Sequence, residues 1–191
     1  VSSGGFKDVM KWMTERERGE WSEIKDFDIG PAPLARVEGD SIAVTFVNHS
    51  TFLIQMQGLN ILTDPVWSER ASPVGFAGPK RMRPPGIRFE DLPAIDIILL
   101  THNHYDHLDI NTLVALADRF NPEIFTPLGV GKYMERKKIV NVTEMDWWDV
   151  AVSQAGLKII CTPAQHFSGR GMFDRDRTLW SGFAIETEKG S

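Results

Sequence analysis

Residues 95–107 read IDIILLTHNHYDH, an apolar run followed at once by a cluster of polar side chains. The run at residues 95–100 is nearly continuous, which is typical of a strand buried on both faces of a sheet. Three histidines and an aspartate follow within residues 102–107. Because α/β sheets place their chemistry beyond the carboxyl ends of strands, we expect a functional site where this strand ends.

His102 and His104 lie two positions apart, so in an extended segment their side chains point to the same side. They can bind one cation together, and a tight loop would then turn Asp106 and His107 toward a neighbouring position. Neutral imidazole and carboxylate are typical zinc ligands, at ~2.0–2.2 Å. Two ligand sets this close predict a site in which two metals, ~3.5–4 Å apart, share a bridging hydroxide.

The alternative is a histidine-rich surface turn, but chance would rarely place such residues where a buried strand ends. A structural zinc site is disfavoured because such sites usually use cysteines, and Cys161 is the only cysteine. His166 follows the predicted strand at residues 157–162. It would complete a three-histidine site with an open position for water. From the residues alone, a hydrogen-bonded loop histidine is an equally good interpretation.

The flanking sequence predicts an α/β fold with helices outside a sheet. Apolar residues alternate at Ile42, Val44 and Phe46, which is typical of a strand. Further strands are expected at residues 52–56, 61–63, 123–126, 157–162 and 180–187, and helices at 110–120, capped by Asp109, and 129–137. Residues 65–93 are rich in Pro and Gly and predict a long loop. Residues 1–40, helix-prone at 6–28, are expected to form an N-terminal arm before a domain at 41–191.

The composition is that of a globular domain, with 42% apolar and 25% charged residues. A net charge of -5, from 26 acids and 21 bases, argues against a nucleic-acid partner. The lone Cys161 cannot form an internal disulfide, and no apolar run approaches the ~20 residues that span a bilayer. We therefore expect a cytoplasmic location, with or without peripheral attachment to a membrane.

Basic residues gather in residues 66–88, which hold five cations (Arg70, Lys80, Arg81, Arg83 and Arg88) against one acid, Glu69, a local charge of +4. Trp67 and Phe76 stand among them. Such a loop could attract an anionic phosphate or a membrane surface. A solvated loop whose arginines bind backbone carbonyls is the alternative, and charge alone slightly favours it.

The pattern His102-x-His104-x-Asp106-His107 resembles the signature of the metallo-β-lactamase superfamily, which implies an αββα sandwich. The resemblance runs from about Ser41 to the end. Residues 48–51, 62–73, 78–81, 100–109, 146–148 and 162–166 resemble the branch of N-acyl-phosphatidylethanolamine-hydrolysing phospholipases D. That branch implies a zinc-dependent phosphodiesterase that uses a metal-bound hydroxide on a phospholipid. A lactonase of the same fold acting on a small molecule, and a metal-binding half-domain without turnover, are the alternatives.

The resemblance also implies roles for particular residues. The first zinc would be held by His102, His104 and His166, and the second by Asp106 and His107. Asp106 would in addition act in catalysis by orienting the hydroxide. Asp64 would lie behind the metal-binding segment and accept hydrogen bonds from its backbone. His49 would lie near the site as a supporting or substrate contact, although a packed turn histidine is an equally good interpretation.

The superfamily uses two more ligands, a bridging aspartate and a final histidine, both downstream of the third histidine. In this branch the aspartate follows a strand like that at residues 180–187, within Gly-Asp-Thr. The chain ends at Ser191 before either, and Asp174 and Asp176 match a loop. We therefore expect a fold incomplete on its C-terminal side, with the first zinc site filled and the second poorly held.

Overall fold

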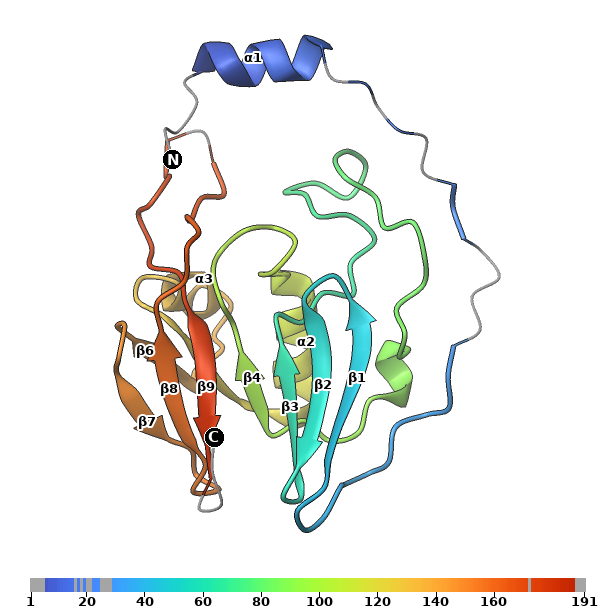
Figure 1. Cartoon of the computed structure of the whole chain (residues 1–191), viewed down its shortest axis with the longest axis vertical. Helices are drawn as coiled ribbons and strands as arrows, with labels where there is room; N and C mark the ends of the chain where they lie inside the picture. Colours follow the sequence, from blue (N-terminus) through green and yellow to red (C-terminus); the bar gives the residue numbers. More distant parts are fainter. Residues whose placement is uncertain are drawn as a thin grey trace.

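Six strands form the larger sheet, in the order β1-β2-β3-β4-β5-β6 (Figure 1). Their bounds are β1 Ile42–Asn48, β2 Thr51–Met56, β3 Leu59–Thr63, β4 Ile97–Leu99, β5 Glu123–Pro127 and β6 Val142–Met145. Strands β1 to β3 pair antiparallel, whereas β3 to β6 pair parallel. The computed structural model describes residues 6–15, 17, 19, 22–24, 29–171 and 173–187.

A smaller antiparallel sheet has the order β7-β8-β9, with β7 Val150–Val152, β8 Lys158–Thr162 and β9 Gly182–Glu186. Within the described residues the helices are α1 Phe6–Glu15, α2 Ile110–Phe120 and α3 Gly131–Glu135, and a 3-10 turn covers Phe89–Asp91. Helices α2 and α3 provide the crossovers that the parallel pairs β4–β5 and β5–β6 require. None of the helices in the described ranges has the length and apolar character needed to span a bilayer.

Helix α2 begins as the sequence predicts. The Asp109 carboxylate accepts hydrogen bonds from the backbone N–H groups of Asn111 and Thr112, which caps the first turn. The helix ends at Asn121, whose φ of 48° is left-handed. Its buried Leu113 and Leu116 point toward the larger sheet.

Two apolar cores define the layers. The first joins Leu113 of α2 and Met134 of α3 to sheet residues such as Ile98. The second lies between the two sheets and joins Ile97 to Ile159 of β8. The order helix, sheet, sheet accounts for three layers of the αββα sandwich, which confirms the predicted fold class.

Strand β1 is confirmed, but much of its apolar face is exposed in the part of the chain that the structure describes. Ile42, Val44 and Phe46 are 62%, 60% and 41% exposed. Ile42 pairs with Met56, which lies in the core between the sheets. The exposed stripe therefore continues the inter-sheet face beyond the area that the described strands β7 to β9 cover.

The helical prediction for residues 6–28 is only partly right. Helix α1 ends at Glu15, and residues 17, 19 and 22–24 are not helical, while 16, 18, 20, 21 and 25–28 lie outside the described residues. Nearer the sheet, Arg36 pairs with Asp96, and Val37 accepts a hydrogen bond from Gly58 N at 2.8 Å. The end of the predicted arm therefore docks on the β2–β3 hairpin.

Candidate metal centre

Several loops meet beyond the carboxyl end of β4, above the strands in Figure 1. Residues 102–108, hereafter the metal loop, connect β4 to α2. The β1–β2 turn carries His49, the loop after β3 begins with Asp64, and the loop after β8 carries His166. The sheet brings together segments more than 100 positions apart in the sequence (49 and 166).

Three imidazole nitrogens face one another in this site. His102 Nε2 lies 2.8 Å from His104 Nδ1 and 3.1 Å from His166 Nε2, and the last pair, His104 Nδ1 and His166 Nε2, is 3.2 Å apart. Hydrogen bonds alone cannot explain this triangle. Each nitrogen carries either a proton or a lone pair, so at least two of the three are alike and repel.

A cation removes the conflict, because all three nitrogens can then offer lone pairs. Ligands ~2.0–2.1 Å from a tetrahedral zinc lie about 3.3 Å from one another, close to the observed separations. The donor set and its geometry therefore fit a zinc-sized cation, with one position left open.

The surroundings keep the first two imidazoles neutral, which is the form that binds metal. Burial lowers the pKa of His102 to about 2, and the neighbouring imidazoles add to this effect. Burial is also the main cause that lowers the pKa of His104, and the neighbouring His166 ring is the next largest cause. Phe167 packs on the rings of His104 and His166, with centroids 4.7 and 5.1 Å away.

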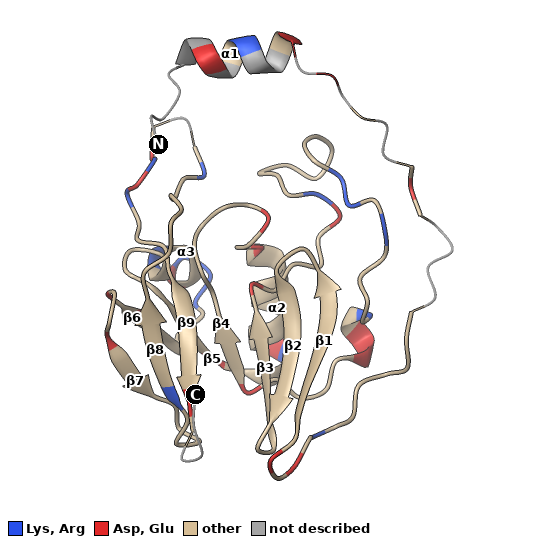
Figure 2. Ribbon diagram, in the orientation of Figure 1, with Lys and Arg blue, Asp and Glu red and all other residues tan. Residues whose placement is uncertain are grey.

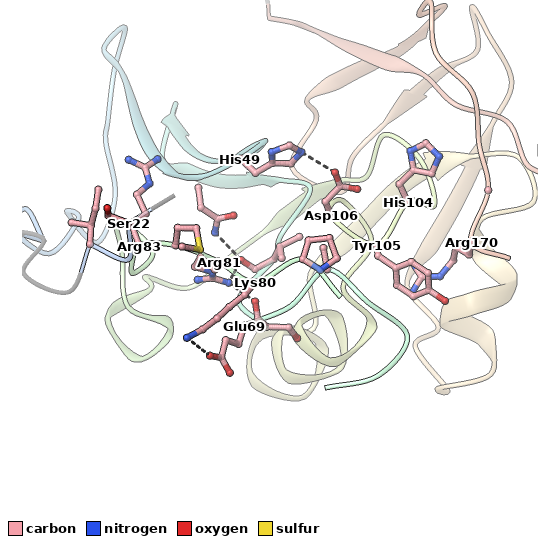
Figure 3. Close-up of a pocket in the computed structure, with 18 of the residues that line it drawn as sticks. Ser22, His49, Glu69, Lys80, Arg81, Arg83, His104, Tyr105, Asp106 and Arg170 are labelled. Carbon is pink, nitrogen blue, oxygen red and sulfur yellow. Dashed lines mark hydrogen bonds and ion pairs between the residues drawn. The ribbon is translucent and has the colours of Figure 1, made fainter. Parts of the chain in front are cut away.

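A second group of possible ligands consists of His49, Asp106 and His107. His49 Nε2 lies 3.1 Å from Asp106 Oδ2 (Figure 3), and both side chains are about half exposed. The rings of His102 and His107 are 4.0 Å apart, so the two groups adjoin. His49 has a φ of 40°, a conformation that few non-glycine residues adopt.

Asp64 lies behind these ligands and is 1% exposed. Its Oδ1 accepts a hydrogen bond from Thr101 N at 2.7 Å, and its Oδ2 lies 2.7 Å from both Thr101 Oγ1 and His107 Nδ1. A carboxylate on Nδ1 leaves Nε2 of His107 with its lone pair. Asp64 therefore accepts hydrogen bonds from Thr101, directly after β4, and contacts the ring of His107, a possible metal ligand.

The site opens into a cavity of about 810 Å³ (Figure 3). Its walls include His49, His104 and Asp106, the basic segment 79–83, and Ser22 of the N-terminal arm. Pockets for ligands typically occupy ~300–1,000 Å³, so the cavity can hold a sizeable substrate group.

Most cations of the basic loop have partners within the protein. Arg81 donates to the backbone oxygens of Val66 and Ser68, and Arg70 to that of Gly78. Lys80 forms ion pairs with Glu23 and Glu69 at 3.0 and 3.2 Å. Lys80 and Arg81 line the same cavity as His104 and Asp106, and Figure 2 shows basic segments in the loops above β1 to β3. Arg70 and Arg81 thus bind backbone carbonyls as the second interpretation of the loop expects, while attraction of an anionic group stays a prediction.

Two residues of the site carry no signal in the sequence pattern. Thr101 Oγ1 lies 2.8 Å from His102 Nδ1 and links that ring to Asp64. Arg170 contacts the metal loop and lines the cavity beside Tyr105 (Figure 3). The sequence points to these two residues only through their position. Thr101 directly precedes His102, and Arg170 follows His166 by four residues.

The side chains of Asp174 and Asp176 accept hydrogen bonds within their own loop, and the sequence also predicts that they belong to a loop. Asp174 Oδ1 accepts hydrogen bonds from the N–H groups of Arg170 and Gly171, which lower the pKa of its carboxyl. Asp176 Oδ1 lies 3.3 Å from Ser168 N. Both aspartates therefore shape the loop that carries His166.

Comparison with known families finds that residues 59–191 match the family described as a beta-lactamase superfamily domain. N-acyl-phosphatidylethanolamine-hydrolyzing phospholipase D 1 of Caenorhabditis elegans is 42% identical over 151 residues, or 74% of this chain and 42% of that protein. The mitochondrial enzyme of the same name from Saccharomyces cerevisiae is 34% identical over 81% of this chain and 34% of its own length. An uncharacterized Mycobacterium tuberculosis protein is 40% identical over 81% of this chain and 43% of its own length.

Solved structures share the fold at lower identity. CmlA, a diiron β-hydroxylase of Streptomyces venezuelae, superposes with a TM-score of 0.55 at 22% identity, over 78% of this chain and 28% of that chain. Igni18, a metallo hydrolase of Ignicoccus hospitalis, superposes with a TM-score of 0.53 at 22% identity, over 77% of this chain and 56% of that chain. The chain spans about two fifths of the length of the first curated relatives that it matches.

Proposed function

Because this chain belongs to the β-lactamase superfamily, we propose that it forms part of a zinc-dependent hydrolase that cleaves phosphodiester bonds in N-acyl-phosphatidylethanolamine-like lipids. The observation that carries the proposal is the triangle of imidazole nitrogens 2.8–3.2 Å apart. The substrate class rests on the relationship to two phospholipases D, at 42% and 34% identity. The prediction from the sequence motif that the chain is a member of this superfamily is confirmed.

The ligands divide between two metal positions in this proposal. His102, His104 and His166 would hold the first ion, and Asp106 and His107 the second. Bound zinc would lower the pKa of a water molecule and stabilise negative charge on the phosphoryl oxygens. Zinc suits imidazole and carboxylate donors, but CmlA is described as a diiron enzyme, so iron has to be measured beside zinc.

The protein's own groups position the reactants. The Asp106 carboxylate is exposed to the cavity and close to His49, so it can accept a proton from an attacking water at Oδ2. Asp64 keeps the proton of His107 on Nδ1, which directs the Nε2 lone pair toward the second position. Burial of His102 excludes solvent from the back of the site.

Peripheral attachment to a membrane is part of the proposal, since a lipid substrate has to be reached at a surface. Val74 and Phe76 are 38% and 84% exposed in the basic loop, and Phe173 is 83% exposed in the loop that follows β8. Large apolar side chains exposed beside a substrate cavity suit insertion at a lipid interface. Both loops contribute to the wall of the cavity.

The test uses metal-loaded full-length protein and an N-acyl-phosphatidylethanolamine. Release of phosphatidic acid is expected, and His104→Ala should abolish it, while the exposed Glu135→Ala on α3 should not change it. An unchanged rate in His104→Ala would sink the assignment. Lactones are assayed in parallel, and hydrolysis of lactones without hydrolysis of the phospholipid would identify a lactonase of the same fold. A protein that binds metal but hydrolyses neither substrate would be a binding module without turnover.

A further inference from the structure

Arg170 reaches from the loop after β8 to the metal loop. Its Nη1 donates hydrogen bonds to the backbone oxygens of Asn103 at 2.9 Å and Leu108 at 2.8 Å. These carbonyls stand near the two ends of the metal loop, and the ligand side chains at positions 104, 106 and 107 lie between them. One guanidinium therefore joins both ends of the loop that carries most of the proposed ligands.

A second contact joins the same two segments. Gly169 N donates to Asn103 Oδ1 at 2.8 Å, and Asn103 is 1% exposed. Asn103 Nδ2 in turn lies 3.3 Å from Tyr133 Oη of α3. Because His166 precedes Arg170 by only four residues, these contacts couple the third imidazole to the loop that supplies the first two.

The guanidinium is itself held in one place. Its Cζ lies 3.8 Å from the centroid of the Tyr105 ring (Figure 3). It lies 5.5 Å from the centroid of the Tyr133 ring, so two aromatic rings fix its position. On the main chain, Arg170 N donates to Asp174 Oδ1 at 3.0 Å. Because the guanidinium is planar and rigid, its hydrogen bonds fix the metal loop relative to the loop after β8.

We propose that Arg170 is a positioning residue for the metal centre, clamping the metal loop to the segment of His166 so that the three imidazole nitrogens stand at metal-binding distance before the metal arrives. The inference rests on the proposed function, because it requires that these histidines bind a metal. Partners that orient metal ligands typically change the metal affinity by about 10–100-fold when they are removed.

Two substitutions separate the hydrogen bonds from the charge. Arg170→Met keeps an unbranched apolar stem but no donor, and leaves two carbonyls without their partner. Arg170→Lys keeps the charge, but its ammonium ends one bond short of the position of Nη1. Arg119→Met is the matched control. Arg119 also donates to two backbone oxygens, those of Phe89 and Glu90, and lies on an aromatic ring, but at the far end of α2.

The readouts are the affinity for Zn²⁺ from chelator competition and the visible spectrum of the Co²⁺-loaded protein, which reports ligand geometry. We expect both Arg170 variants to bind metal at least about tenfold more weakly, with an altered Co²⁺ spectrum, and Arg119→Met to match the wild type. A folded Arg170 variant with wild-type affinity and spectrum overturns the inference. Failure of both variants to fold also overturns it, because Arg170 would then support the fold. A wild-type protein that takes up no metal refutes the proposed function instead.

Discussion

Replacing Asp64 by asparagine should invert the tautomer of His107. The Asp64 carboxylate can only accept hydrogen bonds, so the proton of His107 is held on Nδ1, 2.7 Å away, and Nε2 keeps its lone pair. In Asp64→Asn the amide oxygen stays on Thr101 N, and the amide nitrogen then faces His107 Nδ1. That nitrogen is a donor, so the proton of His107 moves to Nε2 and the lone pair for a metal is lost.

The magnitude follows from the number of contacts that change. Three groups lie 2.7 Å from the Asp64 oxygens, and the substitution retains the one from Thr101 N. Each of the other two changes from a hydrogen bond to a charged group, worth about 1.5–3 kcal/mol, to one between neutral groups, worth about 0.5–1.5 kcal/mol. The two changes together should lower the free energy of unfolding of the metal-free protein by about 1.5–3 kcal/mol. For a chain of this size the loss lowers Tm by about 3–12 °C. Asparagine tolerates the φ of 36° at this position, so backbone strain adds little.

Nitrogen-15 NMR of the metal-free protein shows which ring nitrogen of His107 carries the proton. Asp96→Asn is the control, because Asp96 also accepts a backbone N–H, from Asn60 at 2.8 Å, and pairs with Arg36, but lies before β4. The control should lose stability without changing the tautomer. An Asp64→Asn protein whose His107 keeps its proton on Nδ1 would refute the reasoning.

Metal-free protein should lose stability as the pH falls below 6.5, because burial lowers the pKa of His102 to about 2 and only the unfolded chain then gains the proton. Denaturant unfolding should show about 1 kcal/mol less stability at pH 5.5 than at pH 7.5 from this group, and the same pH dependence in His102→Asn would contradict the assignment. Replacing Phe76 or Phe173 by serine should weaken sedimentation with anionic vesicles about tenfold each, whereas Val140→Ser, equally exposed elsewhere, should have no effect. If all three variants sediment like the wild type, these loops do not enter the membrane. Asp109→Ala should lower the free energy of unfolding by about 2 kcal/mol, since its carboxylate caps α2 and accepts from the backbone of residues 67 and 68, and a loss below about 0.5 kcal/mol would argue against that role.

Local signals in the sequence predict the parts of the fold that local chemistry controls. The apolar run before His102 becomes β4, buried on both faces, because parallel strands between two layers need apolar side chains on each side. Asp109 caps α2 because a carboxylate at that position satisfies N–H groups that have no helical partner. The spacing of His102 and His104 places both rings on one side of the chain, as expected.

Features that depend on distant partners could not be predicted. Strands β6 and β7 are only four and three residues long, too short for a periodic pattern. The alternation of apolar residues in β1 predicts the strand, but whether its apolar face is buried depends on other strands that cover it. The sequence allows arginines of the basic loop to bind backbone carbonyls, but it does not show which carbonyls Arg81 contacts. Arg170 meets the metal loop only through the folding of the chain. The ligand roles of the histidines and aspartates, and the division at residue 40, stay predictions.

The proposed metal centre is tested most directly by crystals of the protein grown with zinc and measured at the zinc absorption edge. The proposal predicts an anomalous peak ~2.0–2.1 Å from His102 Nε2, His104 Nδ1 and His166 Nε2, and its loss in His104→Ala. Crystals that contain zinc elsewhere, with no peak between these three nitrogens, would contradict it.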